Sequence, residues 1–321
     1  MKCRHAVGVF VVITALAACS STGTTAQPPD TVSHPASPTL AATIIATVPV
    51  ADQAVSMAYD GRYLWVGSDS GSVTQVDTTI GQPIRTIRLG GRPAGVAVTS
   101  DGVWIADNAG DTIRRLDPGS GRVNETVRVA ANPLGFARVG AELWVFGQAE
   151  QEISVVDPRT ASVTRTIALA GLGAGYPAVA DGAIWAPDLT GNSRAVWKID
   201  PASGTSSSRL ATGSRPAEIA FGFGSGWVSD DEVVTRFKPS NGAEQARITA
   251  LGSQLDGVAV TSDAVWVAST TDNRITRIDP STNKPTASLG VCTGPRHLTV
   301  IQDDIWVVCY AAGILVRLRE N

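Results

Sequence analysis

Tryptophan recurs along this chain at a nearly constant interval, and that interval constrains the fold more than any other feature. Seven of the eight Trp residues are spaced 39 to 42 residues apart. They are Trp65, Trp104, Trp144, Trp185, Trp227, Trp266 and Trp306. Each lies in a short apolar, β-rich run such as Val103-Trp104-Ile105. Self-similarity at this period is typical of an architecture built from one repeated supersecondary unit.

Each repeat carries the signals of four short strands. A β-rich run such as Gly95–Val98 precedes the Trp run, and Asp101-Gly102 between them predicts a hairpin because Gly tolerates positive φ. A third run ends in Asp, as in Ile275–Asp279, where Asp-Pro starts a turn, and a fourth run follows, as in Pro83–Leu89. Four antiparallel strands per repeat predict an all-β, seven-bladed β-propeller rather than a sandwich.

The ends of the chain predict how this ring closes. The last repeat stops after its third strand, at 315–319, while an unassigned strand at 42–50 has the character of a fourth strand. We therefore expect the N-terminal strand to complete the seventh blade, which removes the exposed edges of a linear array. The repeated Trp residues are then packing groups between blades.

The N-terminus has the composition of a targeting segment. Lys2 and Arg4 precede the uncharged stretch 6–18, which is too short to span a bilayer and fits a secretory signal peptide over 1–18. Leu16-Ala17-Ala18-Cys19 resembles the bacterial lipobox, which implies cleavage before Cys19 and lipidation of its thiol. The alternative is an ordinary signal peptide with an incidental Cys.

Residues 19–41 are rich in Ser, Thr and Pro and too poor in large apolar side chains to form a core, so we expect a tether. The folded domain is then 42–321. These segments predict a protein anchored by lipid to the extracytoplasmic face of a bacterial cell membrane, and we expect a monomer.

Three runs in the repeats resemble known propellers. Pro93–Val98, Val103–Ala106 and Ile275–Pro280 are similar to the seven-bladed YVTN-type propellers and the virginiamycin B lyase-like group. The lyase resemblance implies a His acting as proton acceptor beside a Mg²⁺ held by Glu residues. The sequence departs from that pattern, because Pro295 stands where the metal-binding Glu is expected. The absence of Trp-Asp dipeptides argues against a WD-repeat propeller, and the single Gly-Gly pair argues against kelch.

Function is sought where the repeats differ. Nine residues before each Trp, at the expected mouth of the central channel, stand Ser56, Gly95, Gly135, Tyr176, Glu218, Gly257 and His297. We expect the small residues to leave room there, and Tyr176, Glu218 and His297 to project into the channel. A channel-lining His titrates near neutral pH and can act as acid or base, so His297 is the candidate catalytic residue.

Charged residues are predicted on the same rim. Asp107, Asp188 and Asp230 stand three residues after their Trp, and Arg92, Arg215 and Arg296 precede theirs. With Tyr176 and Glu218 they are the candidate ligand-binding residues, since a polar concave end is the usual ligand site of such a fold. The alternative is that these charges pair with one another and hold the blades in register.

The remaining composition limits cofactors and partners. The net charge of −3 gives no cationic field for nucleic acid, and three His residues exclude a histidine-rich metal centre. We predict no cofactor, except a divalent cation in a lyase. Cys292 and Cys309 remain once Cys3 and Cys19 are assigned to the signal and the anchor, and we predict that they form a disulfide.

These observations favour a binding or interaction module that uses the channel rim for a small molecule or an envelope protein. The main alternative is a lyase or lactone-opening enzyme with His297 as general base and Glu218 with the aspartates holding a cation. A purely structural role in the cell envelope is the third possibility.

Overall fold

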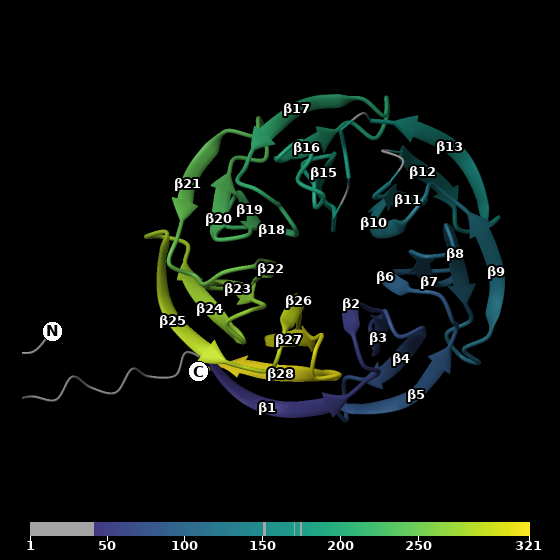
Figure 1. Cartoon of the computed structure of the whole chain (residues 1–321), viewed down its shortest axis with the longest axis horizontal. Coiled ribbons are helices and arrows are strands. Elements are labelled where there is room, and N and C mark those ends of the chain that lie inside the picture. The colour runs from purple at the N-terminus through teal and green to yellow at the C-terminus, as the bar shows by residue number, and fades with distance from the viewer. Residues whose placement is uncertain (1–41, 150–151, 170, 174) are drawn as a thin grey trace, which may run out of the picture. The chain divides into compact units, whose positions relative to one another are not determined.

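The computed structural model describes residues 42–149, 152–169, 171–173 and 175–321. The predicted signal peptide, Cys19 and the tether lie outside these residues. The described part forms seven four-stranded sheets, each antiparallel throughout, and contains no helix. No helix able to cross a membrane is therefore found in it. Figure 1 shows the seven sheets arranged as the blades of a propeller around a common centre. The predicted seven-bladed β-propeller is confirmed.

The strands follow the repeat from the inner to the outer edge of each blade. Blade 1 consists of β2 (Ala54–Tyr59), β3 (Tyr63–Ser68), β4 (Ser72–Asp77) and β5 (Gln82–Arg88). Blade 2 consists of β6 (Pro93–Thr99), β7 (Gly102–Asp107), β8 (Thr112–Leu116) and β9 (Val123–Arg128). Blade 3 consists of β10 (Pro133–Val139), β11 (Glu142–Gly147), β12 (Glu152–Asp157) and β13 (Ser162–Ala168). Blade 4 consists of β14 (Ala178–Ala180), β15 (Ala183–Pro187), β16 (Ala195–Ile199) and β17 (Ser206–Ala211).

The second half of the ring repeats this order. Blade 5 consists of β18 (Ile219–Gly222), β19 (Ser225–Asp230), β20 (Val233–Phe237) and β21 (Glu244–Ile248). Blade 6 consists of β22 (Leu255–Val260), β23 (Val265–Ser269), β24 (Arg274–Asp279) and β25 (Lys284–Gly290). Blade 7 consists of β26 (Pro295–Ile301), β27 (Asp304–Cys309), β28 (Ile314–Glu320) and β1 (Ala42–Pro49).

The N-terminal strand closes the ring as predicted. β1 pairs antiparallel with β28, from Ala42 opposite Glu320 to Pro49 opposite Ile314. Figure 1 shows β1 as the outermost strand of blade 7, next to β5 of blade 1. The two ends of the propeller domain are thus joined by a backbone ladder, and the seventh blade has no vacant edge.

The seven repeated Trp side chains are fully buried between blades. Trp266 of blade 6 packs with Ile305 and Val307 of blade 7, and Trp306 packs with Leu64 and Val66 of blade 1. Because each large aromatic buries its surface against the next blade, the repeated position joins neighbouring repeats into one core. Their predicted role in packing between blades is confirmed.

A cation covers most of these indoles and ties its blade to the next. The Arg115 guanidinium lies 5.7 Å from the Trp104 ring centroid and donates a 2.9 Å hydrogen bond to the Pro158 carbonyl of blade 3. Arg236 does the same over Trp227, with a 2.6 Å bond to the Pro280 carbonyl of blade 6. The Asp-Pro turns are therefore acceptors for contacts between blades as well as turns within them.

Candidate ligand site at the centre of the propeller

The inner strands enclose a small cavity at the centre of the ring. Its volume is about 120 Å³. It is lined by Ser56, Met57, Val96, Leu134, Phe136, Tyr176, Pro177, Glu218, Ile219 and His297. Pockets for drug-sized ligands run from about 300 to 1,000 Å³, so this space suits a few heavy atoms at most.

Three predicted residues meet at this cavity. The Nδ1–H of His297, on β26, donates a 3.0 Å hydrogen bond to Oε2 of Glu218, 79 residues earlier in the chain. The Tyr176 and His297 rings lie 5.5 Å apart, and Tyr176 forms an isolated parallel bridge to Glu218. The pair links blades 5 and 7, and the Glu218 and His297 side chains are only 8% and 15% exposed.

Burial and pairing determine the protonation of this cluster. Burial by itself lowers the pKa of His297, but the charge and hydrogen bond of Glu218 outweigh it and hold that pKa above its ordinary value. Burial raises the pKa of Glu218, and His297 opposes this rise only in part. Burial also raises the pKa of Tyr176, which keeps its phenol protonated. The pair therefore retains its proton to a higher pH than an isolated histidine does.

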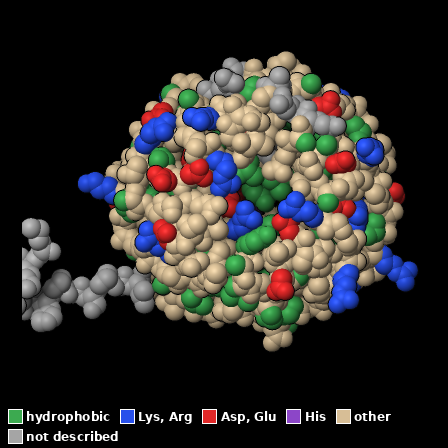
Figure 2. All heavy atoms as spheres, in the orientation of Figure 1, with side chains coloured by type: hydrophobic (Ala, Val, Ile, Leu, Met, Phe, Trp, Pro, Cys, Tyr) green, Lys and Arg blue, Asp and Glu red, His purple; other side chains and the backbone are tan. Residues whose placement is uncertain are grey.

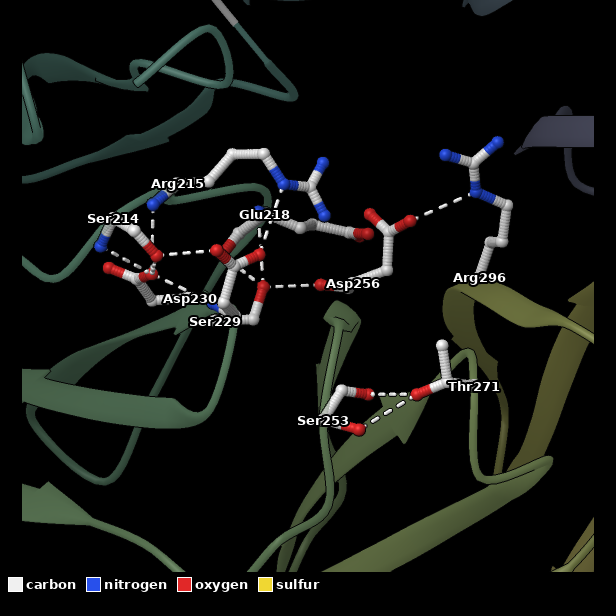
Figure 3. Close-up of polar contacts among 10 residues, drawn as sticks. Ser214, Arg215, Glu218, Ser229, Asp230, Ser253, Asp256, Thr271 and Arg296 are labelled. Carbon is white, nitrogen blue, oxygen red and sulfur yellow. Dashed lines mark hydrogen bonds and ion pairs between the residues drawn. The ribbon is translucent and has the colours of Figure 1, made fainter. Parts of the chain in front are cut away.

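A second charged pair, Asp256 with Arg296, stands beside the first. Arg296 Nε donates a 2.9 Å hydrogen bond to Asp256 Oδ2 (Figure 3). The Arg296 guanidinium lies 4.9 Å from the Tyr310 ring centroid. Burial lowers the pKa of Arg296, but the charge and hydrogen bond of Asp256, together with Tyr176 and Tyr310, outweigh it and raise that pKa.

Asp256 was missed from the sequence, although a signal for it exists. Ten residues before each Trp stand Val55, Ala94, Leu134, Gly175, Ala217, Asp256 and Arg296. Only the last two are charged, with opposite signs in consecutive blades. Comparing this column of the repeat, one residue before the column used above, would have revealed the pair.

The three predicted aspartates are not among the residues that line the cavity. Oδ1 of Asp107 accepts the Arg92 backbone N–H at 2.8 Å, and Oδ1 of Asp230 accepts that of Arg215 at 2.9 Å. Asp188 accepts the backbone N–H of Gly173 at 3.2 Å. Each buried carboxylate caps the turn that precedes the inner strand of its own blade. These contacts lie within single blades, so they differ both from ligand binding and from the pairing of charges between blades that the sequence analysis gave as the alternative.

Other residue types make the same cap in other blades. In blade 6 the Ser269 hydroxyl accepts the Ser253 backbone N–H at 3.2 Å. In blade 7 the equivalent position is Cys309, which forms a disulfide with Cys292 in the corresponding turn. The predicted disulfide is confirmed, and it is the covalent counterpart of the hydrogen-bonded caps.

Arg92 and Arg215 each form an ion pair with a nearby aspartate. Arg92 Nη2 lies 2.8 Å from Asp69, and Arg215 Nε lies 3.1 Å from Asp231. Figure 2 shows Lys and Arg side chains gathered around the central opening of the face in view. The Arg215 Nη2 atom is buried and has no partner among the described residues.

The glycines at the inner position have a different role from the one expected. A Cβ on Gly95 would fall onto the carbonyl oxygen of Leu134, and one on Gly135 onto that of Gly175. At these two positions a Gly is thus required, because adjacent inner strands approach each other closely.

Two hydroxyls at the cavity have no hydrogen-bond partner among the described residues. Ser56 is only 3% exposed, and its Oγ has no hydrogen-bond partner among the described residues. The Tyr176 hydroxyl forms no hydrogen bond within the described ranges either, but it is not among the buried unpaired atoms. Buried polar groups are normally paired, so the Ser56 Oγ marks a place for a water or a ligand.

The described residues contain no group of three or more His, Cys, Asp or Glu side chains arranged to hold a metal ion. Glu218 is bonded to His297, and the three aspartates cap turns. The donor set that the lyase alternative requires for a divalent cation is therefore not assembled in this part of the chain.

No protein-family model and no curated protein matches the sequence. A solved structure of hydrazine synthase from Kuenenia stuttgartiensis resembles the chain with a TM-score of 0.72 and 16% sequence identity. The likeness covers 85% of this chain and 94% of that one. At this identity it shows the fold alone, which is shared by proteins of unrelated function. The class defined by the structure is a seven-bladed β-propeller with a polar cluster in its central cavity.

Proposed function

We propose that this protein is a binding module that takes a small polar ligand at the centre of the propeller. The observation that carries the proposal is the cavity with the Glu218–His297 pair and the buried, unpaired hydroxyl of Ser56. Burying polar groups without partners costs free energy, and the repeats with Gly at this position show that the fold does not require them. A bound ligand would supply the missing partners.

We further propose that the module is anchored by lipid at Cys19 on the extracytoplasmic face of the membrane, as a YVTN-type propeller. The lipobox-like sequence and the propeller motifs support this. The Cys292–Cys309 disulfide agrees with it, because disulfides persist in oxidising compartments.

Thermal shift of the purified full-length chain against a set of small acids, amines, sugars and amides tests the binding role. At least one class should raise the melting temperature of the wild type, and less so that of Glu218→Gln or Ser56→Ala. The matched control is Ser269→Ala, which removes a hydroxyl far from the cavity lining. If no class shifts a folded wild type, or all variants shift equally, the proposed function is wrong.

An enzyme of the lyase type is the second candidate, favoured by the hydrogen-bonded His297–Glu218 pair. The raised pKa shifts His297 toward its protonated form, which favours a general acid over the general base expected from the sequence. Incubation with a cyclic depsipeptide or lactone, with Mg²⁺ or with a chelator, tests it. Metal-dependent loss of the substrate that His297→Ala abolishes would replace the binding proposal.

A further inference from the structure

The hydrogen bonds at the channel mouth leave an excess of donors. Arg296 uses only Nε, so its two terminal nitrogens have no partner among the described residues. Figure 3 shows these nitrogens directed away from Asp256. The Ser56 and Tyr176 hydroxyls and Nε2 of His297 are further unpaired groups at the cavity. Such a set matches a ligand rich in acceptor oxygens.

Arg296 is held in the geometry that recognises a carboxylate. Its Nε is fixed by buried Asp256 and its guanidinium lies over the Tyr310 ring, so the planar fork is ordered before a ligand arrives. The remaining edge presents two parallel N–H donors, which a carboxylate accepts in bidentate fashion. The Arg296 side chain is 32% exposed and thus reachable.

The residues around Arg296 and the cavity determine which end of such a ligand faces Arg296. Val55, Ala94 and Leu134 form an apolar cluster with Tyr176 and Tyr310, and Leu134 also lines the cavity. The Arg296 guanidinium lies over Tyr310, which packs against this cluster, so the guanidinium lies next to Leu134 of the cavity lining. Glu218 inside the cavity is already paired with His297, so the Arg296 fork is the stronger partner for a carboxylate. The charged end of the ligand therefore stays at Arg296, and an uncharged oxygen enters the cavity.

We propose that the ligand is a short-chain hydroxy or oxo acid whose carboxylate binds Arg296 and whose second oxygen bonds to Ser56 and Tyr176. The assignment rests on the proposed function and names its ligand class. The cavity of about 120 Å³ limits the inserted part to a few heavy atoms. A larger acid or the body of a peptide does not fit.

Calorimetric titration of the full-length chain with L-lactate and pyruvate tests the class. Acetate, which has no oxygen outside its carboxylate, and lactamide, which has no charge, are the matched control ligands. Both should bind at least about 10-fold more weakly than lactate, a difference of roughly 1.4 kcal/mol. Lactamide binding as tightly as lactate would overturn the proposal. So would tighter binding of a tripeptide acid than of lactate, which would identify a chain terminus as the source of the carboxylate.

Two variants test the residues. Arg296→Lys keeps the charge but loses the fork, and should weaken lactate about 10-fold or more. Ser56→Ala removes a hydroxyl with no partner in the protein, so it should weaken lactate several-fold without loss of stability. Arg319→Gln is the control, because Arg319 also pairs with a buried aspartate, Asp304, which Arg317 still holds. Unchanged affinity in folded Ser56→Ala and Arg296→Lys would overturn the assignment.

The outcome of these titrations distinguishes the hydroxy-acid assignment from the more general proposal of a binding function. A wild type that binds amines or sugars but no carboxylate refutes the hydroxy-acid assignment and leaves the binding role intact. A folded wild type that binds none of the tested classes refutes both.

Discussion

Blades 1 to 3 and blades 5 to 7 use the same scaffold positions for opposite purposes. Ten residues before the Trp, the first group has Val55, Ala94 and Leu134, while blades 6 and 7 have Asp256 and Arg296. One residue further on, the first group has Ser or Gly, while blades 5 and 7 have Glu218 and His297 and blade 6 has Gly257.

This asymmetry separates what the fold needs from what a site needs. The propeller requires small residues where inner strands approach and apolar ones where they pack, and blades 1 to 3 satisfy both. Nothing in that packing calls for a buried charge, which costs free energy unless it is paired. The charged side of the ring is therefore the side on which function is to be sought.

The largest expected effect concerns the disulfide of blade 7, which stands where other blades have a hydrogen-bonded cap. Replacing Cys292 and Cys309 together by Ala should lower the free energy of unfolding by about 3 kcal/mol, because the cross-link closes a short loop in the unfolded chain. Urea denaturation measures this. Ser269→Ala, which removes only a hydrogen-bonded cap, should cost about 1 kcal/mol. Equal losses would show that the disulfide is no stronger a cap than a hydroxyl.

The next effect concerns blades 1 to 3, whose two aligned inner positions carry no charge. Gly95→Ala should cost about 2 kcal/mol or more, because its Cβ would meet the backbone carbonyl of Leu134, which cannot move freely. Gly290→Ala is the matched control, since nothing lies within 4 Å of a Cβ there, and it should stay within about 0.5 kcal/mol. Urea midpoints of the two variants that coincide would contradict the close-approach explanation.

On the charged side, Glu218→Gln should cost about 1.5 to 3 kcal/mol at pH 6, the usual loss for a hydrogen bond to a charged group. Denaturant titrations of the variant and the wild type at that pH give the difference.

The same variant should change the pH dependence of stability. The pKa of His297 is raised on folding, so its contribution is fully present below its unfolded value of 6.5 and is lost as pH rises through the folded value. Wild-type stability should therefore fall with pH above this point, and Glu218→Gln should flatten the curve. A wild-type stability that rises over that window would refute the assigned ion pair.

The smallest expected effect concerns one atom, the hydroxyl oxygen of Ser56 in blade 1. Ser56→Ala should change the free energy of unfolding by no more than about 0.5 kcal/mol in either direction, because the hydroxyl has no partner to lose. Thermal and urea denaturation without ligand measure it. A loss above 1 kcal/mol would mean that Ser56 serves the fold and belongs with the scaffold positions of blades 1 to 3.

Much of the site could be predicted from the repeats. The predictions that failed did so for one shared reason. Tyr176, Glu218 and His297 stood out because they replace Gly or Ser at one aligned position, and the structure brings them together. Asp107, Asp188 and Asp230 stood out in the same way, yet their carboxylates turn to backbone N–H groups of their own blades. An alignment places a residue in the ring but does not give the direction of its side chain.

The sequence by itself determined the number of blades, the closure by the N-terminal strand and the Cys292–Cys309 bridge. Each follows from spacing along the chain, since a strand or a short loop is specified locally by its own residues and turns. Only the tertiary structure decided that Glu218 meets His297 and that Asp256 orders Arg296. Those contacts depend on how separate blades face one another across the ring, and on which buried polar group offers the nearest partner.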